Sequence, residues 1–168
     1  MSYVSRGYVY RERVIEDLED NYDVTVITQN IDDLHERAGA KNTIHMHGEL
    51  RKIRHTKTGE VKYFEDSIEE NDFLNWRPDI VWFGESIKHM DKIEDALNLA
   101  DIFLCIGTSN QVYPAAGFVT HIKQRQIPTI ELNYEKTQLS DYYDRTILGK
   151  ATQIVPTFIE QEFGIKCD

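Results

Sequence analysis

The 168-residue sequence has little cysteine, and this scarcity excludes several kinds of protein. Its two cysteines lie far apart: Cys105 stands inside the apolar run Ile-Phe-Leu-Cys-Ile-Gly, and Cys167 is the penultimate residue. A disulfide framework needs more cysteines at closer spacing. We therefore expect no such framework, and no nucleophilic role for either thiol.

Long apolar runs and a surplus of positive charge are also missing. No run approaches the length of a membrane span and no hydrophobic signal region opens the chain, so a cytoplasmic protein that binds no membrane is expected. The 19 Lys and Arg against 29 Asp and Glu give a net charge of −10. Direct binding of nucleic acid is not expected, because a basic face is missing, whereas basic, lysine-bearing partners are favoured.

Strands and helices are predicted to alternate along the chain. Apolar runs predict strands at residues 24–28, 80–83, 102–106 and 128–133. Amphipathic or capped stretches predict helices at residues 10–21, 32–38, 86–100 and 114–124. Residues 1–9 are expected to be irregular, 58–59 to form a hairpin turn, and 141–145 to form a surface turn or short helix. This order predicts an α/β fold, a Rossmann-like parallel sheet with helices on both faces, in which residues 80–83 form a central strand.

The stretch Thr-Gln-Asn-Ile-Asp-Asp-Leu-His places polar groups between a strand and a helix. Gln29, Asn30 and Asp32 supply two amides and a carboxylate, which suit ribose hydroxyls or a carboxamide. Beyond the helix stands His47, which can take a proton from a hydroxyl, and then Gly48, where a ligand could approach the backbone. Each residue alone is equally explained by a helix capped by Asp32 or Asn30, and by an ordinary strand histidine. Their co-occurrence in this order indicates a site.

In this order the motifs resemble those of the sirtuins, the NAD-dependent protein-lysine deacylases. The sirtuin signature combines Thr-Gln-Asn-Ile-Asp-x-Leu-His, an Ala-Gly and a catalytic His-Gly, which here stand at residues 28–35, 38–39 and 47–48. Val-Trp-Phe-Gly-Glu at 81–85 and Gly-Thr-Ser at 107–109 extend the match. The resemblance is closest to bacterial sirtuins of the deacetylase and desuccinylase class.

The resemblance implies a role for each of these motifs. The acyl oxygen would attack the ribose carbon of NAD as nicotinamide leaves, and His47 would then act as general base on a ribose hydroxyl, with Asn30 as the second catalytic residue. The residues expected to bind NAD are Gln29, Asn30, Ile31, Asp32, Gly107, Thr108, Ser109, Asn133, Tyr134, Glu135 and Ala151. Those expected to bind an acyl-lysine protein or peptide are Val81, Phe83, Gly84, Glu85 and Val112. NAD would be a consumed co-substrate, and residues 151–156 would join the last strand to the last helix.

The beginning of the chain departs from the sirtuin pattern. The family's glycine-rich Gly-Ala-Gly-x-Ser loop and Gly-Ile-x-x-Phe-Arg segment, which cradle the NAD phosphates, have no counterpart in residues 1–21. We therefore expect an N-terminally truncated sheet, incomplete at one edge. The Tyr-x-x-Arg pair of the desuccinylases is matched only by Tyr3 with Arg6 and by Tyr8 with Arg11, which we interpret as exposed terminal residues.

A zinc module is the second missing feature. Residues 51–76 occupy the place of the family's four-cysteine zinc module, but His55 is the only soft ligand between residues 51 and 75, so a reduced, metal-free insertion without zinc is expected. A metal on His35, His45, His47 and His55 is not expected either, because no cysteine or suitable carboxylate completes the set.

Three functions remain open at this point, all for a single sirtuin-like catalytic domain spanning residues 1–168. The leading hypothesis is an NAD-dependent protein-lysine deacylase, acting as a deacetylase or desuccinylase. The second is a truncated, inactive remnant that retains the peptide groove. The third is an NAD hydrolase or ADP-ribosyl transferase built on the same site.

Overall fold

A computed structural model describes residues 2–5, 14–64 and 73–166. The strands of a large sheet are β1 (Ser2–Ser5), β2 (Thr25–Thr28), β3 (Thr43–His45), β7 (Phe103–Ile106), β8 (Thr129–Asn133) and β9 (Arg145–Leu148). The strands of a small sheet are β4 (Gly48–His55), β5 (Val61–Tyr63) and β6 (Trp76–Ile80). The large sheet is parallel, in the order β3-β2-β1-β7-β8-β9, and the small one is antiparallel, in the order β5-β4-β6.

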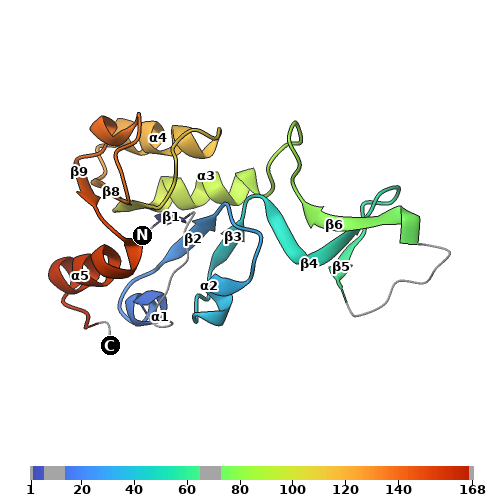
Figure 1. The fold of residues 1–168 in the computed structure, drawn as a ribbon, viewed down its shortest axis with the longest axis horizontal. Coiled ribbons are helices and arrows are strands. Elements are labelled where there is room, and N and C mark those ends of the chain that lie inside the picture. The colour runs from blue at the N-terminus through green and yellow to red at the C-terminus, as the bar shows by residue number, and fades with distance from the viewer. Residues whose placement is uncertain (1, 6–13, 65–72, 167–168) are drawn as a thin grey trace.

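Helices cover both faces of the large sheet, as the sequence predicts. The α-helices are α1 (Val14–Glu19), α2 (Leu34–Arg37), α3 (Met90–Leu99), α4 (Phe118–Gln124) and α5 (Ala151–Phe163). Three short 3-10 helices are η1 (Phe73–Asn75), η2 (Ala115–Gly117) and η3 (Ser140–Tyr142). Figure 1 shows α3 and α4 on one side of the sheet, α1, α2 and α5 on the other, and the small sheet projecting beyond β3. The fold is therefore Rossmann-like.

The core divides between the two faces of the sheet because alternate residues of each strand point to opposite faces. Val26 and Leu104 belong to a buried cluster with residues of α1 and α5, whereas Ile27 and Phe103 belong to a second cluster with residues of α3 and α4. A strand covered on both faces must be apolar at nearly every position. This requirement explains the unbroken apolar run of β7 and the absence of charged residues from β2, which is Thr-Val-Ile-Thr.

The prediction for the start of the chain is wrong where it can be compared. Ser2–Ser5 is not irregular but forms β1, which pairs in parallel with both β2 and β7. The first strand of the chain therefore lies inside the large sheet, between β2 and β7, and the expected gap at one edge is not found among the described strands. Residues 6–13, which include part of the predicted helix, lie outside the described residues, and the described part of that helix is α1.

The predicted strand at residues 80–83 also needs correction. The strand is β6, which ends at Ile80 and pairs antiparallel with β4, so it is not a central strand of the parallel sheet. Its polar side chains are accommodated because the small sheet is open to solvent. The hairpin turn at residues 58–59 is confirmed: Gly59 has φ +75° and its amide donates to the His55 carbonyl at 2.9 Å.

The remaining elements follow the predictions with shifted ends. The strands at 102–106 and 128–133 and the helix after residue 151 are confirmed, while β9 includes residue 145, which was predicted as part of a turn or short helix. The helix at 32–38 is shortened to α2, and the one at 114–124 is divided into η2 and α4. The helix at 86–100 begins only at Met90, because His89 has a left-handed φ of +58°. No helix of the described residues is long and apolar enough to cross a bilayer.

Candidate active site

The residues expected to bind NAD lie at the carboxyl ends of neighbouring strands. Gln29 follows β2, the turn beginning at Gly107 follows β7, Asn133 ends β8, and Ala151 begins α5 just after β9. Parallel strands end at a common edge of the sheet, so these segments meet there although they are far apart in sequence. The predicted set is thus brought to one side of the molecule.

Gln29 provides the clearest sign of a missing ligand. Its side chain is buried, and its Nε2 donates to the Thr108 hydroxyl at 3.2 Å. Its Oε1 is also buried but has no hydrogen-bond partner among the described residues. A buried acceptor without a donor is costly, so a ligand hydroxyl or amide that donates to this oxygen would be bound favourably. A ribose-bearing ligand such as NAD fits this requirement.

Glu131 ties together two of the turns at this edge. Its fully buried carboxylate accepts hydrogen bonds from neutral donors on Asn110, Asn133, Thr137 and Thr146. Asn133 Nδ2 also donates to the Thr108 carbonyl at 2.7 Å. The turn after β7 and the end of β8 are therefore fixed to each other from behind the predicted NAD site.

His47 lies where the two sheets meet, and its ring is oriented by the signature loop. Its Nδ1 is 3.0 Å from the Gln29 carbonyl oxygen, and the Val81 amide donates to the His47 carbonyl at 2.8 Å. Because a carbonyl oxygen can only accept, Nδ1 carries the proton and the lone pair of a neutral ring is on Nε2. This tautomer can act as a proton acceptor, as a general base must.

Gly48 does not have the role suggested by the sequence. Its φ is +81°, and a Cβ atom there would collide with the backbone of Asp79 on β6. The space next to Gly48 is thus filled by the chain itself, not left for a ligand. Glycine is required because β4 and β6 approach each other here while the backbone is left-handed.

The helix cap predicted for Asp32 or Asn30 is not found: the N-cap position of α2 is Asp33, whose side chain makes no capping hydrogen bond. Asp32 Oδ1 instead accepts a hydrogen bond from the Leu34 amide at 3.1 Å and so forms a local turn just before α2. The Ile31 carbonyl accepts from the Leu50 amide at 2.8 Å and so connects the loop to β4. Both residues therefore have structural contacts at the edge of the site.

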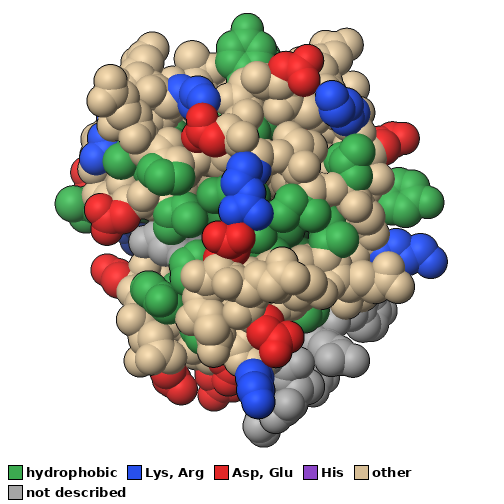
Figure 2. Space-filling model, turned by 90° about the vertical axis from the view of Figure 1, so that its left-hand side faces the viewer, with side chains coloured by type: hydrophobic (Ala, Val, Ile, Leu, Met, Phe, Trp, Pro, Cys, Tyr) green, Lys and Arg blue, Asp and Glu red, His purple; other side chains and the backbone are tan. Residues whose placement is uncertain are grey.

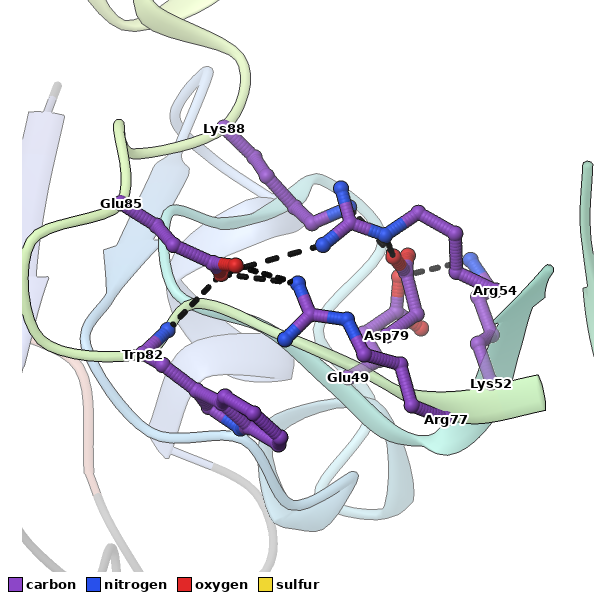
Figure 3. A network of polar contacts seen from close by, with 8 residues as sticks. All are labelled: Glu49, Lys52, Arg54, Arg77, Asp79, Trp82, Glu85 and Lys88. Atoms are coloured by element: carbon purple, nitrogen blue, oxygen red, sulfur yellow. Dashed lines mark hydrogen bonds and ion pairs between the residues drawn. The ribbon is translucent and has the colours of Figure 1, made fainter. Parts of the chain in front are cut away.

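The predicted acyl-lysine loop is held by a charged network, shown in Figure 3. Arg77 NH2 donates to both carboxylate oxygens of Glu85, at 2.6 and 2.9 Å, and its guanidinium lies 4.5 Å from the centre of the Trp82 ring. The Trp82 amide donates to the same carboxylate at 3.1 Å. The Arg77 guanidinium beside Glu85 holds the pKa of that carboxyl below its usual range. Between these anchors Phe83 is fully exposed and Gly84 has φ +87°.

A second part of the same network fastens this loop to the sheets. Asp79 is buried, and its carboxylate pairs with Lys88 at 2.6 Å and with Arg54 at 3.5 Å (Figure 3). The Lys88 amide also donates to the Met46 carbonyl at 2.9 Å. Both ends of the loop are thus anchored next to His47.

Comparison with known proteins gives these residues their context. The family model described as Sir2 family matches residues 6–114. The chain belongs to the Sir2 family. An NAD-dependent protein deacylase of Leishmania major is 47% identical over 165 residues, which are 94% of this chain and 68% of that protein.

Solved Sir2 structures resemble the fold closely. The crystal structure of a Sir2 homologue in complex with NAD is 34% identical and has a TM-score of 0.80, covering 88% of this chain and 62% of that one. A Sir2 structure bound to a myristoylated histone peptide is 29% identical, with a TM-score of 0.78, and covers 88% of this chain and 69% of that one. The chain spans 52% to 68% of the length of the first curated relatives that it matches.

Four further expectations for this Sir2 chain concern a metal on the histidines, the zinc module, the Tyr-x-x-Arg pairs and the cysteines. Among the described residues no three His, Cys, Asp or Glu side chains are grouped to hold a metal ion. The absence of zinc stays a prediction. Both Tyr-x-x-Arg pairs lie outside the part of the chain whose side chains are described. Burial raises the pKa of the Cys105 thiol to about 12, which keeps it protonated and inert.

Three residues that support the Sir2 site were not predicted for it: His45, Arg77 and Glu131. Their sequence signals are weak. The spacing of His45 and His47 predicts one strand, whereas the structure ends β3 at His45 and places His47 in the turn before β4, so the spacing does not reveal what either ring contacts. Glu131 alternates with apolar neighbours, a pattern that favours an exposed position and conceals its burial.

Proposed function

We propose that this chain is an NAD-dependent protein-lysine deacylase that transfers the acyl group of a modified lysine to ADP-ribose and releases nicotinamide. The observation that carries the proposal is the contact of His47 Nδ1 with the Gln29 carbonyl, next to a buried Gln29 side-chain oxygen that has no partner among the described residues. A proton acceptor and a place for a ribose hydroxyl are thus set side by side.

Each part of the site has a role in this proposal. NAD, when bound, supplies the ADP-ribose that accepts the acyl group. Gln29 and Asn30 orient the ribose, Asp32 and the Ile31 backbone face the carboxamide, and His47 takes the proton of a ribose hydroxyl. The turns that begin at Gly107 and Asn133 complete the cofactor side, together with Ala151.

The substrate class follows from the loop between Val81 and Glu85. The Val81 amide donates a hydrogen bond to the His47 carbonyl, so this loop lies beside the proposed base. In the proposal, the Val81 carbonyl accepts a hydrogen bond from the lysine nitrogen of the substrate. Exposed Phe83 and Val112 offer apolar contacts to an acyl-lysine peptide. A related Sir2 protein is bound to a myristoylated histone peptide, which supports this class. Acetyl-lysine is the proposed substrate and succinyl-lysine a finer alternative, for one catalytic domain with residues 51–76 as its small module.

A second candidate is a remnant that binds acyl-lysine peptides but does not release nicotinamide. One observation favours it: the chain spans 52% to 68% of the first curated relatives, and the glycine-rich phosphate motif is absent from residues 1–21. This candidate predicts the same peptide loop with weak NAD binding.

Nicotinamide release from NAD by the purified chain separates the two. We expect release that depends on an acetyl-lysine or succinyl-lysine peptide, and a loss of at least about 100-fold in His47→Ala. His121→Ala is the matched control, since His121 is an exposed histidine on α4 that contacts Asn98 at 3.0 Å and should leave release unchanged. A folded wild-type chain that releases no nicotinamide would favour the remnant, and release without any peptide would favour an NAD hydrolase.

A further inference from the structure

His45 is buried beside the signature loop, and both of its ring nitrogens contact oxygen atoms. Nδ1 lies 3.2 Å from the Asn30 carbonyl oxygen, and Nε2 lies 2.6 Å from a carboxylate oxygen of Glu36. A carbonyl oxygen and an ionised carboxylate only accept hydrogen bonds, whereas a neutral imidazole has a single N–H to donate. Both contacts are therefore hydrogen bonds at the same time only when the ring is an imidazolium.

The charges around the ring favour that state. Burial acts to lower the pKa of His45, but the Glu36 hydrogen bond and charge, the Asn30 carbonyl and the charge of Glu49 on β4 outweigh it and raise the pKa. For Glu36, burial acts to raise the pKa, but the contact with His45 leaves it below its usual range. Burial lowers the pKa of His35, the other titratable group of α2 near the ring.

The backbone that His45 holds belongs to the proposed NAD site. Asn30 directly follows Gln29, whose carbonyl oxygen contacts His47 Nδ1 at 3.0 Å. His45 and His47 thus contact the carbonyl groups of two consecutive residues. Their two contacts fix the direction in which the peptide units at Gln29 and Asn30 point, and therefore where the following loop lies.

We propose that His45 is a positioning residue for NAD binding: its imidazolium, held between the Asn30 carbonyl and the Glu36 carboxylate, fixes the turn that carries Gln29 and Asn30. The inference rests on the proposed function, because that turn is where the proposed function places NAD. When the ring loses a proton it has one N–H for two acceptors, so one contact is lost and the turn becomes freer.

The pH dependence follows from the direction of the shift. The pKa of His45 is higher in the folded protein than in the unfolded chain, so the imidazolium contacts are complete below the ordinary histidine value. They are lost as the pH rises through the raised value. NAD affinity should therefore decrease as the pH rises above the ordinary histidine value and through the raised pKa of His45.

Two variants test this by calorimetric titration with NAD at a series of pH values. Glu36→Gln keeps the size of the side chain but removes the charge that favours the imidazolium, so the loss of affinity should occur at a lower pH than in the wild type. His45→Gln should weaken NAD binding about tenfold and abolish that alkaline limb. In turnover, KM for NAD should rise while KM for the acyl-lysine peptide stays the same. His121→Gln, the exposed control, should behave as the wild type.

The protonation of His45 can be observed without any activity. Nitrogen-15 spectra of the histidine rings should show that both ring nitrogens of His45 stay protonated to a higher pH in the wild type than in Glu36→Gln. Loss of the second ring proton at the same pH in both proteins, or an unchanged affinity profile in Glu36→Gln, would overturn the proposal. A chain that binds NAD with this pH profile but releases no nicotinamide would support the role of His45 and reject the deacylase function.

Discussion

At the scale of single residues, Glu131 shows how a buried charge is kept without a cation. Its donors are two amides and two hydroxyls, so the carboxylate is solvated by the protein in place of water. Two of these donors belong to the loops of the proposed NAD site. Asn110 has a left-handed φ of +55°, and Asn133 Nδ2 also donates a hydrogen bond to the Thr108 carbonyl. One side chain thus keeps two loops of the proposed NAD site in place.

We expect Glu131→Leu to destabilise the fold by about 3 kcal/mol, because it leaves several buried donors without an acceptor. Glu131→Gln should cost about 1 kcal/mol or less, since its Oε1 can still accept from Asn110, Asn133 and Thr137. Urea unfolding of both variants measures the difference. Equal losses in the two would mean that the charge, and not the acceptor geometry, is what the site needs.

At the scale of elements, the turn from Val81 to Glu85 depends on neighbours that lie outside it. Arg77 reaches it from β6: one terminal guanidinium nitrogen donates to both carboxylate oxygens of Glu85, and the guanidinium lies 4.5 Å from the centre of the Trp82 ring (Figure 3). A guanidinium makes these contacts together because it is planar and has several donors, whereas an ammonium is a point charge. The exposed Phe83 is therefore presented by a turn whose base is rigid.

Arg77→Lys should raise KM for an acyl-lysine peptide about fivefold and leave KM for NAD unchanged, because a point-like ammonium cannot hold both the Glu85 carboxylate and the Trp82 ring as the planar guanidinium does. Arg145 is the matched control, since it pairs with Glu162 at 2.8 Å and lies 5.7 Å from the Phe158 ring at the β9 end of the molecule. Figure 2 shows that end, where charged side chains of both signs lie among hydrophobic ones. If Arg145→Lys raised the peptide KM as much, the effect of Arg77→Lys would be a general loss of stability.

The elements that were predicted well from the sequence are those with a strong local pattern of apolar residues. The apolar runs of β2, β7 and β8 are long enough to indicate buried strands, and the signature loop was placed correctly at the end of β2. β1 and β9 were missed, because short strands such as Ser-Tyr-Val-Ser are defined by the strands on which they pair. Similarly, the helix that contains α2 was predicted, but no local pattern reveals that Glu36 of this helix contacts His45.

At the scale of the whole molecule, the two sheets have very different support. The large sheet has buried apolar clusters on both faces, whereas Ile53 is the one apolar side chain that is buried within β4, β5 and β6 among the described residues. The small sheet relies on surface contacts, such as Lys62 over the Trp76 ring at 4.2 Å, and on the network of Figure 3. Such a region should open without unfolding the rest.

Native-state hydrogen exchange should therefore show two levels of protection. The amides of Thr56 and Phe64, bonded within the small sheet, should exchange through openings at least about 2 kcal/mol less costly than those of Phe103 and Gly107, bonded between β7 and β8. Low urea should leave the exchange of the first pair unchanged and accelerate that of the second, because only global unfolding exposes much surface. Equal free energies and equal urea dependence would mean that the two sheets unfold as one unit, and that the proposed peptide loop is as stable as the core.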